Sequence, residues 1–361
     1  MTQAVYEELL AVMKSRRGPY AGLDIPEFFA LVKELFTPEE AAVNNVLGKQ
    51  PETLEELADK LKRDPEELHP LLESMADKGL CATFVKGGRR VYQGLPFMPG
   101  IFEYQFLGGN ESARCRKLAR RIADYKKAYN AARGVEQITF PVTRVIPVDK
   151  KIDFRDQIHT YDQVATYIQK NDSIGVGACF CRHAARLRGE DIHDMPVEVC
   201  MWFGTAADYL VERLGGKKVS KAEAMALLDE TEQAGLLHMS RNTTEDIQFL
   251  CNCDRWHCEV VTHVLKQPKP GSVFNSGYKP RFDAEKCVAC ETCIERCPPG
   301  ALTMGDEKPP AVNPDRCFGC AVCATGCPEE AIVMEAKPEF PPPPKDVTEL
   351  IAALKANRPQ E

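Results

Sequence analysis

Cysteine is the residue most suited to chemistry in this chain, which has 361 residues and 16 cysteines. Eight of them form a repeat in which three cysteines are separated by two residues and a fourth follows after three more, directly before proline. The halves start thirty residues apart and contain Cys287, Cys290, Cys293 and Cys297, then Cys317, Cys320, Cys323 and Cys327. Thiolates are soft metal ligands, and this spacing is typical of loops that bind a pair of [4Fe–4S] clusters.

The fourth cysteine of each half has a particular role in such a repeat, because it binds the cluster of the other half. We therefore expect cluster 1 to be bound by Cys287, Cys290, Cys293 and Cys327. Cluster 2 would be bound by Cys317, Cys320, Cys323 and Cys297. A pair of zinc sites is the alternative, but zinc would use two Cys-x2-Cys pairs and would need neither the third cysteine nor the Cys-Pro.

Six further cysteines form a second group in the middle of the chain, namely Cys179, Cys181, Cys200, Cys251, Cys253 and Cys258. In a reducing compartment such a group indicates metal ligands rather than disulfides. His193 and His257 lie nearby in the sequence and could supply nitrogen ligands. Four of these side chains could hold a third [4Fe–4S] cluster, the interpretation that we favour. Another metal, such as zinc with mixed ligands, and buried structural thiols are the alternatives.

Two resemblances support these interpretations. Residues 279–335 resemble the bacterial-type two-[4Fe–4S] (dicluster) ferredoxins, with all eight ligand positions present. The whole chain is similar to anaerobe ferredoxin-domain proteins that have a winged-helix-like front and a cysteine-rich middle. Relatives tend to have a cysteine where this chain has His193 and more cysteines near His257, so this chain has fewer thiols. The segments that carry this resemblance are GACFCRH (177–183), PVEVC (196–200), AGLLH (234–238) and CNC (251–253).

Residues 1–108 predict three helices followed by a hairpin. Thr37 and Thr53 each precede a helix and have glutamate three residues later, which is the pattern of a capping box. A third helix begins at Asp64-Pro65 and stops at Gly79. Two short strands, 80–85 and 90–93, then flank a turn with two glycines. This order of elements is that of a winged helix.

A winged helix suggests DNA binding, but the charge of this region argues against it. Residues 1–107 contain 12 lysines and arginines against 17 acidic residues. The helix that would enter the groove carries Glu66, Glu67, Glu73 and Asp77, where DNA contact requires basic side chains. We therefore expect a docking or scaffold role, and nucleic acid is not an expected partner.

The remaining elements suggest an α+β protein with four parts. Expected helices are 112–132, 160–169, 197–214, 220–234 and 347–356, and expected strands are 138–148 and 173–176. The expected parts are a winged-helix-like domain (1–108), a mixed α/β cysteine-rich domain (109–278), a ferredoxin-like two-cluster module (279–335), and a proline-rich linker with a terminal helix (336–361).

Composition limits the cellular setting. The net charge of −7 and a hydrophobic content of 44% are ordinary for a globular protein and unlike a basic nucleic-acid binder. No stretch approaches the roughly 20 apolar residues of a membrane helix, so membrane insertion is not expected. Glu7 and Glu8 interrupt any export signal, and we expect a cytoplasmic protein.

The expected function is ferredoxin-type electron transfer, as a subunit or partner of an anaerobic oxidoreductase. We expect a redox partner protein and an electron carrier rather than a stand-alone enzyme. One alternative is an oxidoreductase that reduces a small substrate at the metal site of the middle domain. A second is a redox-responsive winged-helix regulator. The sequence indicates no catalytic residue, electron donor, electron acceptor or oligomeric state.

Overall fold

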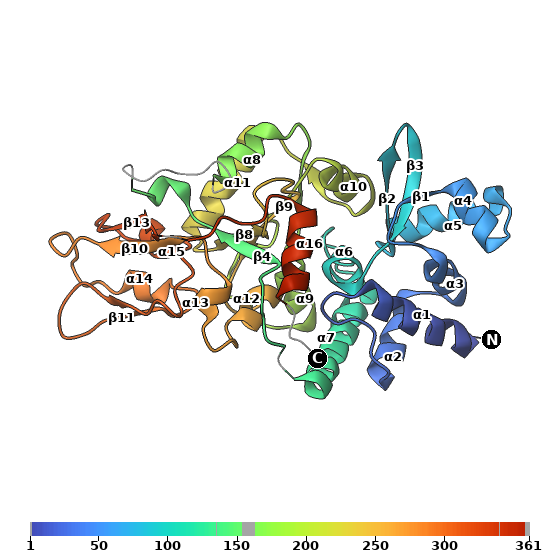
Figure 1. Cartoon of the computed structure of the whole chain (residues 1–361), viewed down its shortest axis with the longest axis horizontal. Helices are drawn as coiled ribbons and strands as arrows, with labels where there is room; N and C mark the ends of the chain where they lie inside the picture. Colours follow the sequence, from blue (N-terminus) through green and yellow to red (C-terminus); the bar gives the residue numbers. More distant parts are fainter. Residues whose placement is uncertain (1, 135, 154–162, 339, 358–361) are drawn as a thin grey trace. The chain divides into compact units, whose positions relative to one another are not determined.

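The computed structural model describes residues 2–134, 136–153, 163–338 and 340–357 (Figure 1). The chain divides into two compact units. Unit 1 comprises residues 1–134, 177–191 and 208–217, and unit 2 comprises residues 135–176, 192–207 and 218–361. The expected middle domain (109–278) is therefore shared between the two units. The four-part division given by the sequence stays a prediction.

Unit 1 is mainly helical, with one small antiparallel sheet in the order β1-β3-β2. Its strands are β1 (Glu52–Thr53), β2 (Cys81–Lys86) and β3 (Arg89–Gly94). Its helices include α1 (Thr2–Arg16), α2 (Pro26–Leu35), α3 (Pro38–Val46), α4 (Leu54–Leu61), α5 (Pro65–Asp77), α6 (Phe102–Tyr104), α7 (Ala113–Arg133) and α9 (Phe180–Arg188).

Local signals in the sequence set the ends of these helices. Thr37 and Thr53 both form complete capping boxes, because each side chain accepts from the third amide of its helix and the glutamate there accepts in return. Asp64 caps α5, and Ser112 caps α7 by accepting from the amide of Cys115. The predicted helices and the hairpin of β2 and β3 are confirmed.

The core of unit 1 is aromatic. The rings of Phe97 and Phe102 are stacked with centroids 4.7 Å apart, and Phe28 and Tyr125 pack around them. Tyr125 joins the long helix α7 to the loop between α1 and α2, because its hydroxyl donates to the backbone oxygen of Ala21. Burial of this kind is the main source of stability for a helical unit.

The sheet of unit 2 contains β4 (Thr143–Ile146), β8 (Leu237–Arg241), β9 (Phe249–Cys253) and β6 (Cys200–Phe203) as antiparallel neighbours in this order. β5 (Ile174–Gly177) and β7 (Lys217–Lys218) are short strands of the same sheet. This region also contains the helices α8 (Val164–Lys170), α11 (Lys221–Gln233), α12 (Glu259–Val264), α13 (Pro270–Val273) and α16 (Val347–Ala356). Helix α10 (Thr205–Arg213) begins here, but its residues from 208 onward belong to unit 1.

Several predictions for this region are confirmed and one is wrong. The capping box of Ser220 and Glu223 begins α11, and α16 matches its expected range. The expected helix 197–214 is wrong in its first half, since Cys200–Phe203 forms a strand and only Thr205–Arg213 is helical. A short apolar run is compatible with either a helix or a strand. Here the pairing of residues 200–203 with β9 makes the segment a strand. The expected strand 138–148 is confined to Thr143–Ile146, and residues 160–162 of the expected helix 160–169 lie outside the described residues.

The two faces of this sheet carry different cores. One face carries Ile146, Met201 and Leu250, which pack with residues of α8 and α11. The other face carries Val145, Leu237 and Met239, which pack with residues of α12 and with Phe318 and Val322 from the C-terminal cysteine repeat. The second face therefore brings the middle of the chain against the repeat, within unit 2.

The cysteine repeat itself consists of two similar halves joined by short sheets. β10 (Tyr278–Phe282) pairs with β13 (Ile332–Ala336), and β11 (Leu302–Thr303) pairs with β12 (Ala311–Val312). Each half has one short helix, α14 (Thr292–Glu295) or α15 (Val322–Thr325). Among the helices that the structure describes, none has the length and apolar character needed to cross a bilayer.

Candidate metal centres

The first of two hollows in the C-terminal repeat encloses about 350 Å³ when the open space at its mouth is included. Four cysteines line it, and one of them comes from the second half of the repeat: Cys287, Cys290, Cys293 and Cys327. Apolar side chains, among them Phe282 and Ile332, form much of the remaining wall. Soft ligands in an apolar wall suit an iron–sulfur cluster.

The second hollow is lined by the complementary set of cysteines and encloses about 310 Å³, again with the open space at its mouth included. Its cysteines are Cys297, Cys317, Cys320 and Cys323, so the first half of the repeat supplies one of four. Phe318 and Met334 contribute to its apolar wall. The structure thus brings together the two sets of four cysteines that the spacing predicts for crossed ligation.

Backbone conformation explains how each loop surrounds its hollow. Ala289 and Glu291 in the first loop have positive φ angles of 57° and 61°, and Gly319 and Ala321, thirty residues later, have 68° and 67°. Left-handed residues of this kind turn backbone N–H groups toward one side of a loop, where they can meet an anion. The conformation repeats with the sequence, although glycine occupies only one of the four positions.

Backbone amides donate hydrogen bonds to sulfur atoms of the repeat. The amide of Ala301 donates to Sγ of Cys297 at 3.2 Å, and the amide of Ala331 donates to Sγ of Cys327 at 3.3 Å. These two cysteines are the ones that each half contributes to the opposite hollow. Such N–H···S bonds stabilise thiolate charge and influence the reduction potential of a bound cluster.

The hollows differ in exposure and in the acidity of their thiols. Cys290 at the first hollow is exposed, and hydrogen bonds from the side chain and amide of Thr292 lower the pKa of its thiol. Burial raises the pKa of Cys293 to about 11 and also raises the pKa values of Cys320 and Cys323. All four cysteines of the second hollow are buried. A metal bound there would replace the protons of these thiols at sulfur, so that metal binding releases protons.

The middle cysteines are divided between the two units. Cys179 and Cys181 are buried at the start of α9 in unit 1. The other four belong to unit 2, where Cys200 begins β6, Cys251 and Cys253 lie on β9, and Cys258 precedes α12. Sγ of Cys258 lies 3.2 Å from Sγ of Cys253, whose thiol also contacts Cys251.

The two candidate histidines lie together beside this group. The ring centroids of His193 and His257 are 5.9 Å apart, and the Trp256 ring lies 4.4 Å from that of His193. Nδ1 of His257 is 3.5 Å from a carboxylate oxygen of Asp254. Over the described ranges, no three or more His, Cys, Asp and Glu side chains are arranged as a site for a single metal ion.

Two polar contacts near these cysteines are not evident from the sequence. Asn252 lies between Cys251 and Cys253, and its Oδ1 accepts from Nδ1 of buried His238 at 2.7 Å. Arg255 donates to the backbone oxygen of Cys297 at 3.2 Å and so joins the middle loop to the second hollow. The only sequence signal for Arg255 is its position between Cys253 and Cys258.

Comparison with known proteins agrees with this geometry. Residues 286–331 match the family described as a 4Fe-4S dicluster domain. No curated protein and no solved structure matches the chain. The chain therefore contains an iron–sulfur module of the ferredoxin kind, and this module supports a general role in electron transfer.

Proposed function

We propose that this chain is a ferredoxin-type electron-transfer protein that works as a subunit or partner of an oxidoreductase. The observation that carries the proposal is the pair of hollows, each lined by three cysteines of one half of the repeat and one of the other. In this proposal, Cys287, Cys290, Cys293 and Cys327 hold cluster 1, and Cys297, Cys317, Cys320 and Cys323 hold cluster 2. Bound clusters of this type exchange single electrons.

The exposure of the two hollows supports a direction for partner access. The loop at the first hollow is open, with Cys290 exposed and Val288 58% exposed. The second hollow lies behind buried residues, and its Phe318 ring packs edge-on against Phe274 at 5.1 Å. A redox partner protein would therefore approach the loop 287–291, because the four cysteines of the second hollow are buried.

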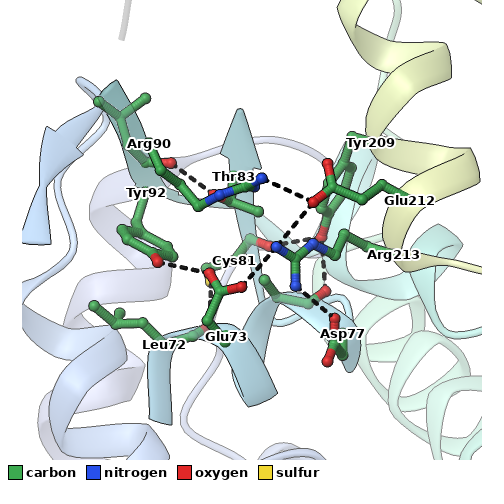
Figure 2. A network of polar contacts seen from close by, with 12 residues as sticks. Leu72, Glu73, Asp77, Cys81, Thr83, Arg90, Tyr92, Tyr209, Glu212 and Arg213 are labelled. Carbon is green, nitrogen blue, oxygen red and sulfur yellow. Dashed lines mark hydrogen bonds and ion pairs between the residues drawn. The ribbon is translucent and has the colours of Figure 1, made fainter. Parts of the chain in front are cut away.

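The N-terminal part supports a scaffold role better than DNA binding. Its elements follow the winged-helix order, and α5 would be the recognition helix. Figure 2 shows the guanidinium of Arg213 on α10 between two acidic residues of α5, at 2.6 Å from Glu73 and 3.0 Å from Asp77. Tyr209 also donates to the backbone oxygen of Ala76. The C-terminal half of α5 is thus engaged inside unit 1, and the exposed part of the helix carries glutamates.

The hairpin of β2 and β3 also forms an ion pair with α10. Arg90 on β3, one of the few basic residues of the hairpin, pairs with Glu212 of α10 at 2.8 Å (Figure 2). A basic side chain that is neutralised within the fold is a weaker contact for phosphate, and non-specific DNA affinity depends on such charges. We propose that this part positions the electron-transfer module on a partner.

Iron and sulfide analysis of anaerobically purified full-length protein tests the proposed function. We expect at least about eight iron and eight sulfide per chain, with spectra of two interacting four-iron clusters after reduction. The control is the Cys287→Ser/Cys317→Ser double variant, in which both signals should be lost or strongly altered. Zinc in place of iron, or far fewer than eight iron atoms, would overturn the proposal. Salt-sensitive DNA binding that depends on the clusters would favour the regulator instead.

A further inference from the structure

We infer that Cys200, Cys251, Cys253 and Cys258 form a third iron–sulfur site, placed beside the second hollow. The inference rests on the proposed function, since it extends the same set of centres into the middle of unit 2. The sequence allows many choices of four ligands among six cysteines and two histidines. Three features of unit 2 favour these four cysteines. They are the register of the strands, a tight turn after β9, and a hydrophobic core shared with the second hollow.

Strand register brings the first two thiols together. In the antiparallel pair of β6 and β9, Met201 lies opposite Leu250 and Trp202 opposite Phe249. Continuing this register by one residue sets Cys200 opposite Cys251. Directly opposed residues point to the same face of a sheet, with Cβ atoms about 4.5–5.5 Å apart. Cys200 and Cys251 are therefore neighbours on one face.

The alternation of β9 adds a third thiol to that face. Residues two apart on a strand share a face, so Cys253 lies beside Cys251. Pairing with β8 sets Met239 opposite Cys251 and Leu237 opposite Cys253. Met239, Leu237 and Cys253 all belong to the core that includes Phe318. The thiols thus lie on the face that packs against the C-terminal repeat.

A tight turn after β9 brings the fourth thiol, that of Cys258, next to the thiol of Cys253. The carboxylate of Asp254 accepts from the amides of Trp256 and His257, at 2.8 and 2.6 Å, and so bends the chain directly after β9. Cys258 follows this turn, with its Sγ 3.2 Å from that of Cys253. Cys200, Cys253 and Cys258 are buried, and Cys251 is partly buried. Four soft donors thus lie in one protected region, and although the described side chains are not arranged around a single metal ion, a four-iron cluster is a larger group.

The thiols and the second hollow share one core. Cys253 and Cys258 pack in the same hydrophobic core as Phe318 and Cys320, which line the second hollow. Arg255, within the turn, donates to the backbone oxygen of Cys297, a further residue of that hollow. Four cysteines are the ligand set of a [4Fe–4S] cluster, and they are also a set that zinc accepts. Proximity to the second hollow favours the redox-active group.

The experiment uses full-length protein purified without oxygen, with iron, acid-labile sulfide and zinc measured per chain. The wild type should contain about 12 iron and 12 sulfide, as three four-iron clusters require. Cys253→Ser and, separately, Cys200→Ser should each reduce the iron to about eight while the spectra of both ferredoxin clusters persist. Cys115→Ser, which changes a buried cysteine of α7, is the matched control and should keep the wild-type content.

Mössbauer spectroscopy of iron-57-labelled wild type counts the clusters without any substitution and covers the case in which a variant fails to fold. About eight iron with one zinc, or eight iron and unchanged content in the variants, would overturn the third site and leave the proposed function intact. Loss of the third set of iron in Cys181→Ser would overturn the four-ligand assignment. Fewer than about eight iron in the wild type would instead contradict the proposed function.

Discussion

Nη1 of Arg255 lies 3.2 Å from the backbone oxygen of Cys297 and donates a hydrogen bond to it. The two residues belong to segments 42 positions apart, the turn after β9 and the end of the first cysteine motif. A positive charge held beside one cysteine of the second hollow favours the more negative, reduced state of a cluster bound there.

Arg255→Met should therefore lower the reduction potential of cluster 2 by about 20–60 mV, given that 59 mV corresponds to a tenfold change for one electron. Cluster 1 should keep its potential, because the described contact of Arg255 is with a residue of the second hollow. Spectroelectrochemical titration of both clusters checks this, with Arg188→Met, a half-buried arginine paired with Glu190, as the control. An equal shift of both potentials would show that Arg255 has no specific relation to the second hollow.

Crossed ligation makes two reciprocal predictions. Cys297→Ser should damage cluster 2, because Cys297 lines the second hollow, although Cys287, Cys290 and Cys293 of the same motif line the first. Cys327→Ser should damage cluster 1 for the corresponding reason. Electron paramagnetic resonance of the reduced variants distinguishes the clusters. Selective loss of cluster 1 in Cys297→Ser would disprove the crossed arrangement.

Oxygen should attack the two clusters in a fixed order. The first hollow has an exposed cysteine, Cys290, whereas all cysteines of the second hollow are buried. Exposure controls the access of oxidants to a metal–thiolate site. On exposure to air, we expect the signal of cluster 1 to disappear several-fold faster than that of cluster 2. Spectra recorded over time measure both rates, and equal rates would mean that burial does not protect the second hollow.

Asn252 should be important for the strand pair that carries the middle thiols. Its Oδ1 accepts from His238 at 2.7 Å, and its Nδ2 donates to the backbone oxygen of Val199 at 2.6 Å. Asn252→Ala would leave both buried partners without this contact and should reduce the free energy of unfolding by about 2–3 kcal/mol. Urea unfolding under anaerobic conditions measures the effect. Asn357→Ala at the exposed end of α16 is the control, and a similar small effect of both substitutions would contradict the prediction.

Glu73 should make unit 1 sensitive to acid. Burial alone would raise the pKa of Glu73, but hydrogen bonds from Tyr92 and Arg213 outweigh burial and lower it (Figure 2). A carboxyl with a lowered pKa stabilises the fold above its unfolded pKa, near 4.5, and this contribution is lost as the pH falls through the folded pKa. Glu73→Gln should cost about 1 kcal/mol at pH 7, since the network is partly exposed.

Hydrogen exchange, followed by mass spectrometry on peptides of α5 and α10, measures the loss of stability of unit 1 at acidic pH. Between pH 5.5 and pH 3.5, after correction for intrinsic rates, the wild type should lose more protection than Glu73→Gln. The matched control is Glu66→Gln, an exposed glutamate of the same helix, which should behave like the wild type. A larger loss of protection in Glu73→Gln than in the wild type would reverse the inferred sign.

Much of the local structure could be predicted because it depends on neighbours in the sequence. The capping boxes of Thr37, Thr53 and Ser220 formed as expected, since each involves only three or four residues of one helix turn. The eight cysteines of the repeat were identifiable for the same reason, because their spacing alone is typical of cluster-binding loops. The family match to a 4Fe-4S dicluster domain agrees with that part of the prediction.

Other features needed tertiary contacts. The apolar run at Cys200–Phe203 was expected to be helical, and only its pairing with β9 made it a strand. That pairing also decides which middle cysteines are neighbours, because register is a relation between segments about fifty residues apart and leaves no local trace. The hydrogen bond from Arg213 to Glu73 likewise depends on tertiary structure, since these residues are 140 positions apart.

By itself, the sequence determined the cofactor chemistry of the C-terminal repeat, because ligand type and spacing lie within two short loops. The tertiary structure alone decided the exposure of Cys290, the burial of the second hollow and the placement of the middle thiols against it. Burial and contact arise when distant segments pack together, and the free energy of that packing depends on the whole unit rather than on any one stretch of sequence.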